Sequence, residues 1–216
     1  MKITKIEPQK KFKGRSNVYL DDTFAFGLSD FDLHKLHIKV GMELSESALA
    51  SIRQDVLLSE AKQHALHLLD RHTYTEKAMA RKLSERYNDS QITSEVISFL
   101  KGYRYIDDES YARRYIEAAL QSGKSGLFKI KYDLCGKGIS KEMVEKVATE
   151  FTDEGRMENE QETVSKLLEK KLRGDFSFPN KMKAKRYLLS RGFSSESIDS
   201  ALSKLRNEGE EEWLDV

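Results

Sequence analysis

Hydrophobic positions change their spacing once along the chain, and this change separates two kinds of structure. Near the N-terminus apolar and polar residues alternate in Ile3–Ile6, Asn17–Leu20 and Thr23–Phe26, which predicts three short strands. Asp21-Asp22 lies between the last two strands and predicts a hairpin turn. From Ser45 onward the apolar residues recur at helical spacing, so we expect helices joined by turns over the rest of the chain.

The helical part repeats itself at a shift of 54 residues, because the pattern at 138–144 returns at 192–198. Gly138 and Gly192 are typical of a residue that ends a helix in the left-handed conformation. Ser140 and Ser194 are then expected to cap the next helix. Each of these helices carries one apolar stripe, formed by Met143, Val144, Val147 and Phe151 in one copy and by Ile198, Ala201, Leu202 and Leu205 in the other.

A weaker third copy upstream completes the expected organisation of the chain. We expect a mainly α fold of tandem three-helix repeats in an elongated, curved array, preceded by a small N-terminal β-hairpin and helix segment. The expected parts are an N-terminal segment at 1–58, repeats at 59–107, 108–156 and 157–206, and an acidic tail at 207–216.

Charge is segregated along the chain, although the formal net charge of its 216 residues is only +1. The tail at 207–216 carries five carboxylates and no Lys or Arg, whereas residues 166–206 carry eleven basic and four acidic residues. A basic segment followed by an acidic tail is typical of a protein that binds a polyanion. The alternative is a set of solvated helix faces.

Composition narrows the class of protein further. The lone Cys135 excludes an intramolecular disulfide. No apolar run approaches the roughly 18 residues that a membrane span needs, and Met1–Lys5 lacks the apolar core of a secretory signal. We therefore expect a cytoplasmic protein without membrane contact.

Three motifs resemble catalytic or ligand sites without completing one. Gly123-Lys124-Ser125 resembles the end of a phosphate-binding loop, but Ala118 stands where that loop needs glycine, so we interpret it as a turn. Asp107-Asp108 precedes an apolar helix stripe and is expected to cap it rather than to act as an acid/base pair. Cys135 lacks an identifiable base partner.

The histidines are paired in sequence but lack further ligands. His34 and His37, and likewise His64 and His67, lie three residues apart, and neither pair has the third ligand that a zinc site needs. We therefore expect no catalytic residues, no metal and no cofactor, and hence a protein that binds rather than an enzyme.

Basic residues are the strongest remaining functional signal. Because Lys129 and Lys131 recur as Lys183 and Lys185, like charges are expected at equivalent places on successive repeats. Such a basic track would meet backbone phosphates without reading bases. Five tyrosines are further candidates for stacking on bases, namely Tyr103, Tyr105, Tyr111, Tyr115 and Tyr132. Tyr111 and Tyr115 lie four residues apart and are expected instead to belong to the core. The expected track consists of Lys124, Lys129, Lys131, Lys137, Lys181, Lys183, Lys185, Arg186 and Arg191.

An ordered set of motifs resembles the family of RecX regulatory proteins. Its centre is Tyr105–Ile116, where a Tyr-Ile-Asp-Asp run precedes a Tyr-Ala pair and a Tyr-Ile pair. The glycine-rich turn Gly123–Gly126 and the Leu134–Ile139 stretch follow in the family's order, and Ile3–Glu7 resembles the opening of its longer members. The chain departs from the family at Gly102–Ile106, where extra residues separate the glycine from the aspartates.

The resemblance implies a regulator without catalytic residues that acts in DNA repair, recombination and the SOS response. RecX-like proteins bind the RecA filament on single-stranded DNA and hinder its growth or promote its disassembly, which lowers strand exchange and cleavage of the LexA repressor. We accordingly expect a monomer whose partners are the RecA filament, single-stranded DNA and, more weakly, duplex DNA. The alternative is a stand-alone helical nucleic-acid-binding protein that acts without RecA.

Overall fold

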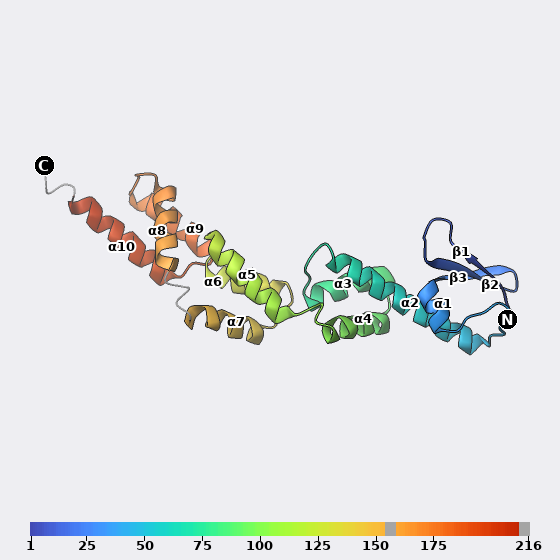
Figure 1. The fold of residues 1–216 in the computed structure, drawn as a ribbon. Coiled ribbons are helices and arrows are strands. Elements are labelled where there is room, and N and C mark those ends of the chain that lie inside the picture. Colours follow the sequence, from blue (N-terminus) through green and yellow to red (C-terminus); the bar gives the residue numbers. More distant parts are fainter. Residues whose placement is uncertain (154–158, 212–216) are drawn as a thin grey trace. The chain divides into compact units, whose positions relative to one another are not determined.

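The computed structural model describes residues 1–153 and 159–211, and it places a small sheet before a series of helices (Figure 1). The described chain forms two compact units. The first contains Met1–His72 and Met79–Tyr105, and the second contains Thr73–Ala78 and the chain from Ile106 onward.

The N-terminal sheet contains three antiparallel strands in chain order, namely β1 (Ile3–Pro8), β2 (Arg15–Leu20) and β3 (Thr23–Ser29). Asp21 and Asp22 join β2 to β3 with φ angles of 45° and 65°. Two successive positive φ angles are the geometry of the tight hairpin turn whose twist matches that of the strands. The predicted hairpin and its turn are therefore confirmed.

Two helices follow the sheet, α1 (Asp30–Lys35) and α2 (Glu46–Leu69). The N-terminal half of α2 buries Leu49, Ile52 and Val56 in the core of the sheet. Its C-terminal half instead buries small residues and packs against a later helix of the first unit. Because α2 runs through residues 58 and 59, the division of the chain at that point remains a proposal.

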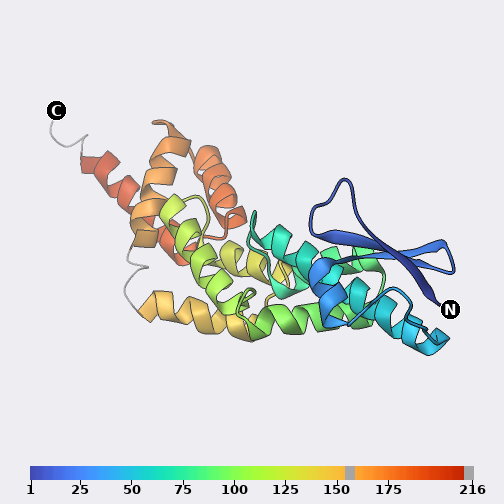
Figure 2. The ribbon, with the colours of Figure 1, turned by 45° about the vertical axis from the view of Figure 1, so that its right-hand side comes forward.

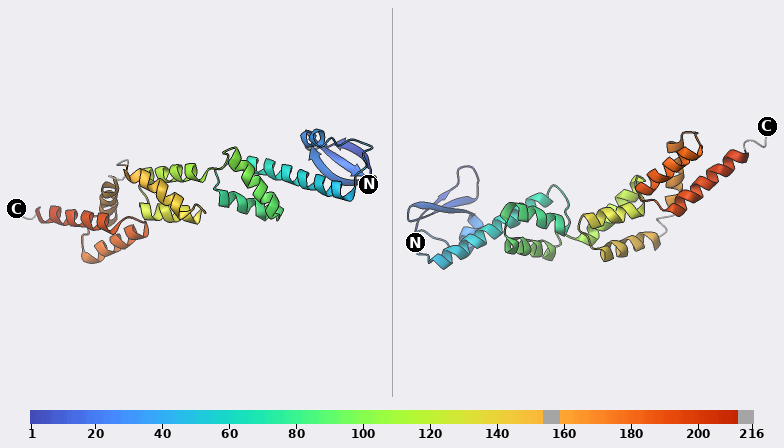
Figure 3. Two further views of the ribbon diagram at one scale, coloured as in Figure 1. Left: turned by 90° about the horizontal axis from the view of Figure 1, so that it is seen from below. Right: turned by 180° about the vertical axis from the view of Figure 1, so that it is seen from behind.

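The remaining helices follow in groups, and with α2 they form three successive three-helix repeats (Figures 1 and 3). This confirms the predicted tandem repeats of a mainly α fold; the elongated, curved array remains a prediction. The helices are α3 (Glu76–Tyr87), α4 (Ser90–Gly102), α5 (Asp108–Ser122), α6 (Leu127–Gly136), α7 (Lys141–Asp153), α8 (Asn159–Leu172), α9 (Phe178–Ser190) and α10 (Ser195–Glu211). The expected acidic tail begins inside α10, and residues 212–216 lie outside the described chain.

The repeats share a core of equivalent positions. Leu134 of α6 and Leu188 of α9 are both fully buried, as are Val144 and Ile198 at the matching places of α7 and α10. Full burial of such a side chain contributes about 1.5–3 kcal/mol to folding. The second and third repeats therefore each have their own apolar core, as the stripes in the sequence predict.

Hydroxyl and carboxylate caps begin the helices where the sequence places them. The Oγ atoms of Ser140 and Ser194 accept hydrogen bonds at 3.2 Å from backbone N–H groups in the first turns of α7 and α10. Asp107 caps α5 by accepting from Ser110 N at 3.0 Å. Asp108 instead accepts from the N–H of Glu76 at 2.8 Å, so its carboxylate caps the start of α3. These bonds satisfy donors that a helix cannot satisfy internally.

The two repeated glycines lie where the turn after one helix comes very close to the preceding repeat. Gly192 has φ +80°, and a Cβ atom built on it would lie only 2.2 Å from the backbone N of Lys129. Its carbonyl oxygen accepts from Phe128 N at 3.2 Å, while that of Arg191 accepts from Gly126 N at 2.9 Å. The turn after α9 thus binds the first turn of α6.

The same arrangement recurs 54 residues earlier within the second unit. Gly138 has φ +97°, and its Cβ would lie 2.4 Å from the Cβ of Lys77. The adjacent carbonyl of Lys137 accepts from Thr75 Oγ1 at 2.7 Å. Both contacts leave room only for hydrogen on the α-carbon, so the glycines serve close approach as well as helix termination.

We expect Gly192→Ala to destabilise the protein more than Gly174→Ala. Both positions have positive φ, near +80°, but only Gly192 meets another backbone, and nothing lies within 4 Å of a Cβ at Gly174. The control should lose about 1–2 kcal/mol, the usual cost of left-handed backbone for an L-residue. Thermal unfolding measures both variants, and equal losses would show that the close approach does not matter.

Candidate nucleic-acid interface

Three lysines of the expected basic track are held in ion pairs. Lys131 contacts Glu145 and Lys185 contacts Asp199, each at 2.5 Å between Nζ and a carboxylate oxygen. The hydrogen bond from Lys185 holds the pKa of Asp199 below its ordinary value. Lys129 contacts Asp133 at 2.9 Å on its own helix. Because the first two pairs tie the second helix of a repeat to its third, much of this repeated charge is compensated inside the repeat.

Two further track residues lie against aromatic rings at equivalent turns. The Lys137 Nζ lies 5.4 Å from the ring centroid of Tyr115, and the Arg191 guanidinium lies 5.3 Å from that of Tyr187. Burial raises the pKa of the Tyr115 hydroxyl. Cation–π attraction fixes both cations at the surface without neutralising them.

The remaining track residues on α9 are spread around its outer side. Lys183 and Arg186 are exposed, and Lys181 is half-buried. The structure therefore brings the expected track residues together only in part.

Five cations gather around a concave surface at the junction of the second and third repeats, which we call the basic bowl. It encloses about 580 Å³. Tyr187 and Leu167 contribute its uncharged lining, and the side chains come from α8, α9 and the turn after α5, which lie together in Figure 2. The charged residues of the basic bowl are Lys124, Lys170, Lys171, Arg173 and Arg191.

Local structure holds these charges together. The Lys171 Nζ lies 4.5 Å from the ring centroid of Tyr187, so this ring carries two cations, Lys171 and Arg191. Arg173 itself has φ +51°, and Gly174 follows with φ +83° where the chain leaves α8. Among the described residues that line the bowl there is no carboxylate. Five clustered cations repel one another, and an anion with several oxygens, such as a chain of phosphates, relieves that repulsion.

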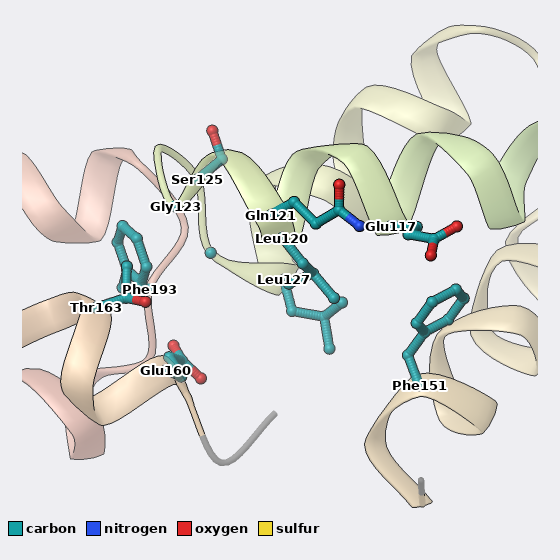
Figure 4. A pocket seen from close by; sticks show the side chains of 11 residues that line it. Glu117, Leu120, Gln121, Gly123, Ser125, Leu127, Phe151, Glu160, Thr163 and Phe193 are labelled. Atoms are coloured by element: carbon teal, nitrogen blue, oxygen red, sulfur yellow. The ribbon is translucent and has the colours of Figure 1, made fainter. Parts of the chain in front are cut away.

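A second cavity at this junction has the opposite character. It encloses about 350 Å³, and Leu120 and Leu127 lie opposite Phe151 within it (Figure 4). Glu117 and Glu160 also line it. Glu160 accepts a hydrogen bond from the N–H of Ser194 at 2.9 Å, so it supports the start of α10. With two carboxylates and an apolar wall, this cavity does not suit a phosphate.

The residues that resemble catalytic or ligand sites in the sequence have structural roles in the fold. Gly123 ends α5 with φ +60°, so Gly123-Lys124-Ser125 forms the predicted turn between helices. His64 packs edge-on against Tyr87 at 5.9 Å, and burial holds the pKa of its imidazole below the ordinary value. In the described parts of the chain no three His, Cys, Asp or Glu side chains are grouped for a metal, and no helix is long and apolar enough to span a membrane.

Five residues of the bowl were absent from the expected track, namely Leu167, Lys170, Lys171, Arg173 and Tyr187. The high positive charge of residues 166–206 pointed to this region. The convergence of α8, α9 and the turn after α5 is a tertiary feature that charge along the sequence does not reveal.

Neutralising the bowl with Lys170→Gln, Lys171→Gln and Arg173→Gln together should weaken binding to single-stranded DNA. A plot of log affinity against log salt concentration should become shallower, by about 0.7 in slope for each phosphate contact that is lost. Thermal stability should change little, because exposed substitutions usually cost under about 0.5 kcal/mol each. Fluorescence anisotropy over a salt series measures the slope.

The matched control replaces three exposed lysines that do not line the bowl, Lys39, Lys141 and Lys204, with Gln. It has the same net charge as the bowl variant. If both triple variants weaken binding equally, net charge and not the bowl is responsible.

Comparison with known proteins links this geometry to one family. The regulatory protein RecX N-terminal domain matches residues 1–45, and the second and third three-helix domains of RecX match 107–147 and 158–202. The chain is 31% identical to "Regulatory protein RecX" of Clostridium botulinum, over 95% of this chain and 97% of the relative. It is also 31% identical to the protein of that name in Clostridioides difficile, over 95% and 96%.

Solved structures agree with these matches. A crystal structure of regulatory protein RecX has 30% sequence identity and a TM-score of 0.73, covering 94% of this chain and 98% of the other. The crystal structure of RecX from Lactobacillus salivarius has 27% identity and a TM-score of 0.61, covering 69% of this chain and 97% of the other.

Proposed function

Because this chain belongs to the family of RecX regulatory proteins, we propose that it binds the filament of RecA on single-stranded DNA and restrains it. It acts by binding and not by catalysis, as a monomer in the cytoplasm and without a cofactor. The consequence is lower strand exchange and lower co-protease activity of RecA. The basic bowl is the observation that carries the proposal, since a filament assembled on DNA presents a continuous line of phosphates.

The exposed apolar residues on the outer faces of α6 and α9 favour a protein partner in addition to the DNA. Phe128 and Tyr132 are 67% and 77% exposed on α6, and Phe178 is 75% exposed at the start of α9. Met182 and Leu189 continue the exposed apolar surface along α9. Large apolar side chains gathered on an exposed face mark interaction surfaces more often than isolated ones do. Their occurrence on two successive repeats suits a partner that is itself a repeating polymer.

A stand-alone nucleic-acid-binding protein remains the second candidate, because the bowl would bind phosphates with or without RecA. The two candidates differ in what the protein does to RecA. Only the first predicts an effect at fewer than one molecule per RecA protomer, since blocking the extension of a filament affects every protomer that would have joined it.

Titrating this protein into RecA should depress the ATPase activity that single-stranded DNA stimulates, at less than one molecule per protomer. The variant with a neutralised bowl should need a higher concentration for the same depression. The measurement is the steady-state rate of ATP hydrolysis, with filament length followed in parallel. Unchanged hydrolysis and unchanged length at equimolar protein would refute the proposed function and leave the second candidate.

A further inference from the structure

Three aromatic rings form an exposed cluster at the end of α4 in the first unit. The ring centroids of Phe99 and Tyr103 are 5.0 Å apart, and those of Tyr103 and Tyr105 are 6.1 Å apart with 28° between their planes. Tyr103 is 68% exposed and Tyr105 is 52% exposed. We call these three residues the aromatic platform. Two large rings thus remain open to solvent beside a third.

The backbone explains why the rings come together. Tyr105 N donates to Leu100 O at 2.8 Å and Arg104 N donates to Lys101 O at 3.0 Å, which is the hydrogen-bond pair of a Schellman helix end. This motif places Tyr105 on Phe99, whose centroids are 6.3 Å apart. Arg104 takes the left-handed position with φ +56°, where glycine is usual and other residues cost about 1–2 kcal/mol.

Tyr103 is not needed for that helix end. The hydrophobic contact of the motif is made by Phe99 and Tyr105, and Tyr103 adds a ring whose surface is mostly exposed. The platform is therefore a local feature without a structural requirement for its most exposed member.

One cation lies over a ring of the platform, and two more belong to the same helix end. The Lys62 Nζ lies 4.9 Å from the ring centroid of Phe99, and Lys101 and Arg104 are exposed in the same helix end. Flat aromatic faces next to basic side chains are the combination that binds single-stranded nucleic acid, because rings stack on unpaired bases and cations meet the adjoining phosphates. An apolar protein surface would gain little from three neighbouring cations.

We propose that the aromatic platform stacks on an unpaired base of single-stranded DNA, with Tyr103 as the principal stacking ring. Lys62 and Arg104 then meet the neighbouring phosphates. The proposal rests on the proposed function for its ligand, since the DNA of such a filament is single-stranded. It adds a contact to bases, whereas the basic bowl contacts only backbone.

The test compares two oligonucleotides of equal length and charge, oligo-dT and an abasic analogue, by anisotropy without RecA. The full-length protein should bind oligo-dT more tightly than the abasic strand. Tyr103→Phe keeps the ring and should behave like the parent. Tyr103→Leu keeps an apolar side chain without a π face and should bind oligo-dT about tenfold more weakly, the effect expected for one stacked base. It should also lose the preference for bases.

Two control variants distinguish stacking at the platform from stacking elsewhere and from phosphate binding. Phe31→Leu removes a ring on α1 that is 74% exposed and should leave the preference for bases intact. The variant with a neutralised bowl should bind both oligo-dT and the abasic strand more weakly, and it should still prefer oligo-dT. An RNA strand of the same base sequence shows whether the platform also accepts RNA, and tighter binding of RNA than of oligo-dT would overturn the assignment to DNA.

Two results overturn the proposal outright. One is equal affinity of the parent for oligo-dT and the abasic strand. The other is a Tyr103→Leu variant that binds oligo-dT as tightly as the parent, because Tyr103 would then not stack on a base. Since the assay lacks RecA, a failure of the proposed regulation leaves the stacking result unaffected, and the two failures are distinguishable.

Discussion

The second unit depends on a contact between two backbones that only glycine permits. At Gly192 the turn after α9 lies against the first turn of α6, with no room for a Cβ atom. Two hydrogen bonds to the carbonyls of Arg191 and Gly192 then fix this approach. The contact sets the position of Lys124, in the turn just before α6, relative to α8. Arg191 belongs to the same turn and also lines the basic bowl, so the joint between repeats and the candidate phosphate site are built from the same residues.

Residues that recur at the 54-residue shift identify the structural repeat more clearly than they identify a binding site. Lys131 and Lys185 occupy equivalent positions, and each forms an ion pair with an acid that is itself repeated, Glu145 or Asp199. Exposed ion pairs contribute at most about 1 kcal/mol each, but they compensate the charge that a ligand would otherwise meet. Apart from Arg191, which repeats Lys137, the charged residues of the bowl are not repeated in this way. Their charges remain uncompensated within its lining, which makes the bowl the stronger candidate for phosphates.

Local features of the fold were predictable from the sequence, and tertiary ones were not. The hairpin turn at Asp21-Asp22, the caps at Ser140 and Ser194 and the apolar stripes follow from signals within a few residues, and the structure has all of them. The sharing of α2 between the sheet core and the first repeat was not predictable, because its helical pattern is continuous. The bowl was also missed, since it requires α8, α9 and a distant turn to meet. The sequence placed Lys131 and Lys185 on a binding track because their ion pairs with a neighbouring helix are tertiary contacts too.

Amide hydrogen exchange on the protein bound to RecA filaments tests the central claim most directly, that the basic bowl meets the DNA of the filament. We predict slower exchange in peptides that cover the end of α8 and α9, both on bare single-stranded DNA and on the filament. The outer faces of α6 and α9 should be protected further only when RecA is present. If the protein co-sediments with the filament while exchange around Lys171 and Arg191 stays unchanged, the bowl is not the site and the account is wrong.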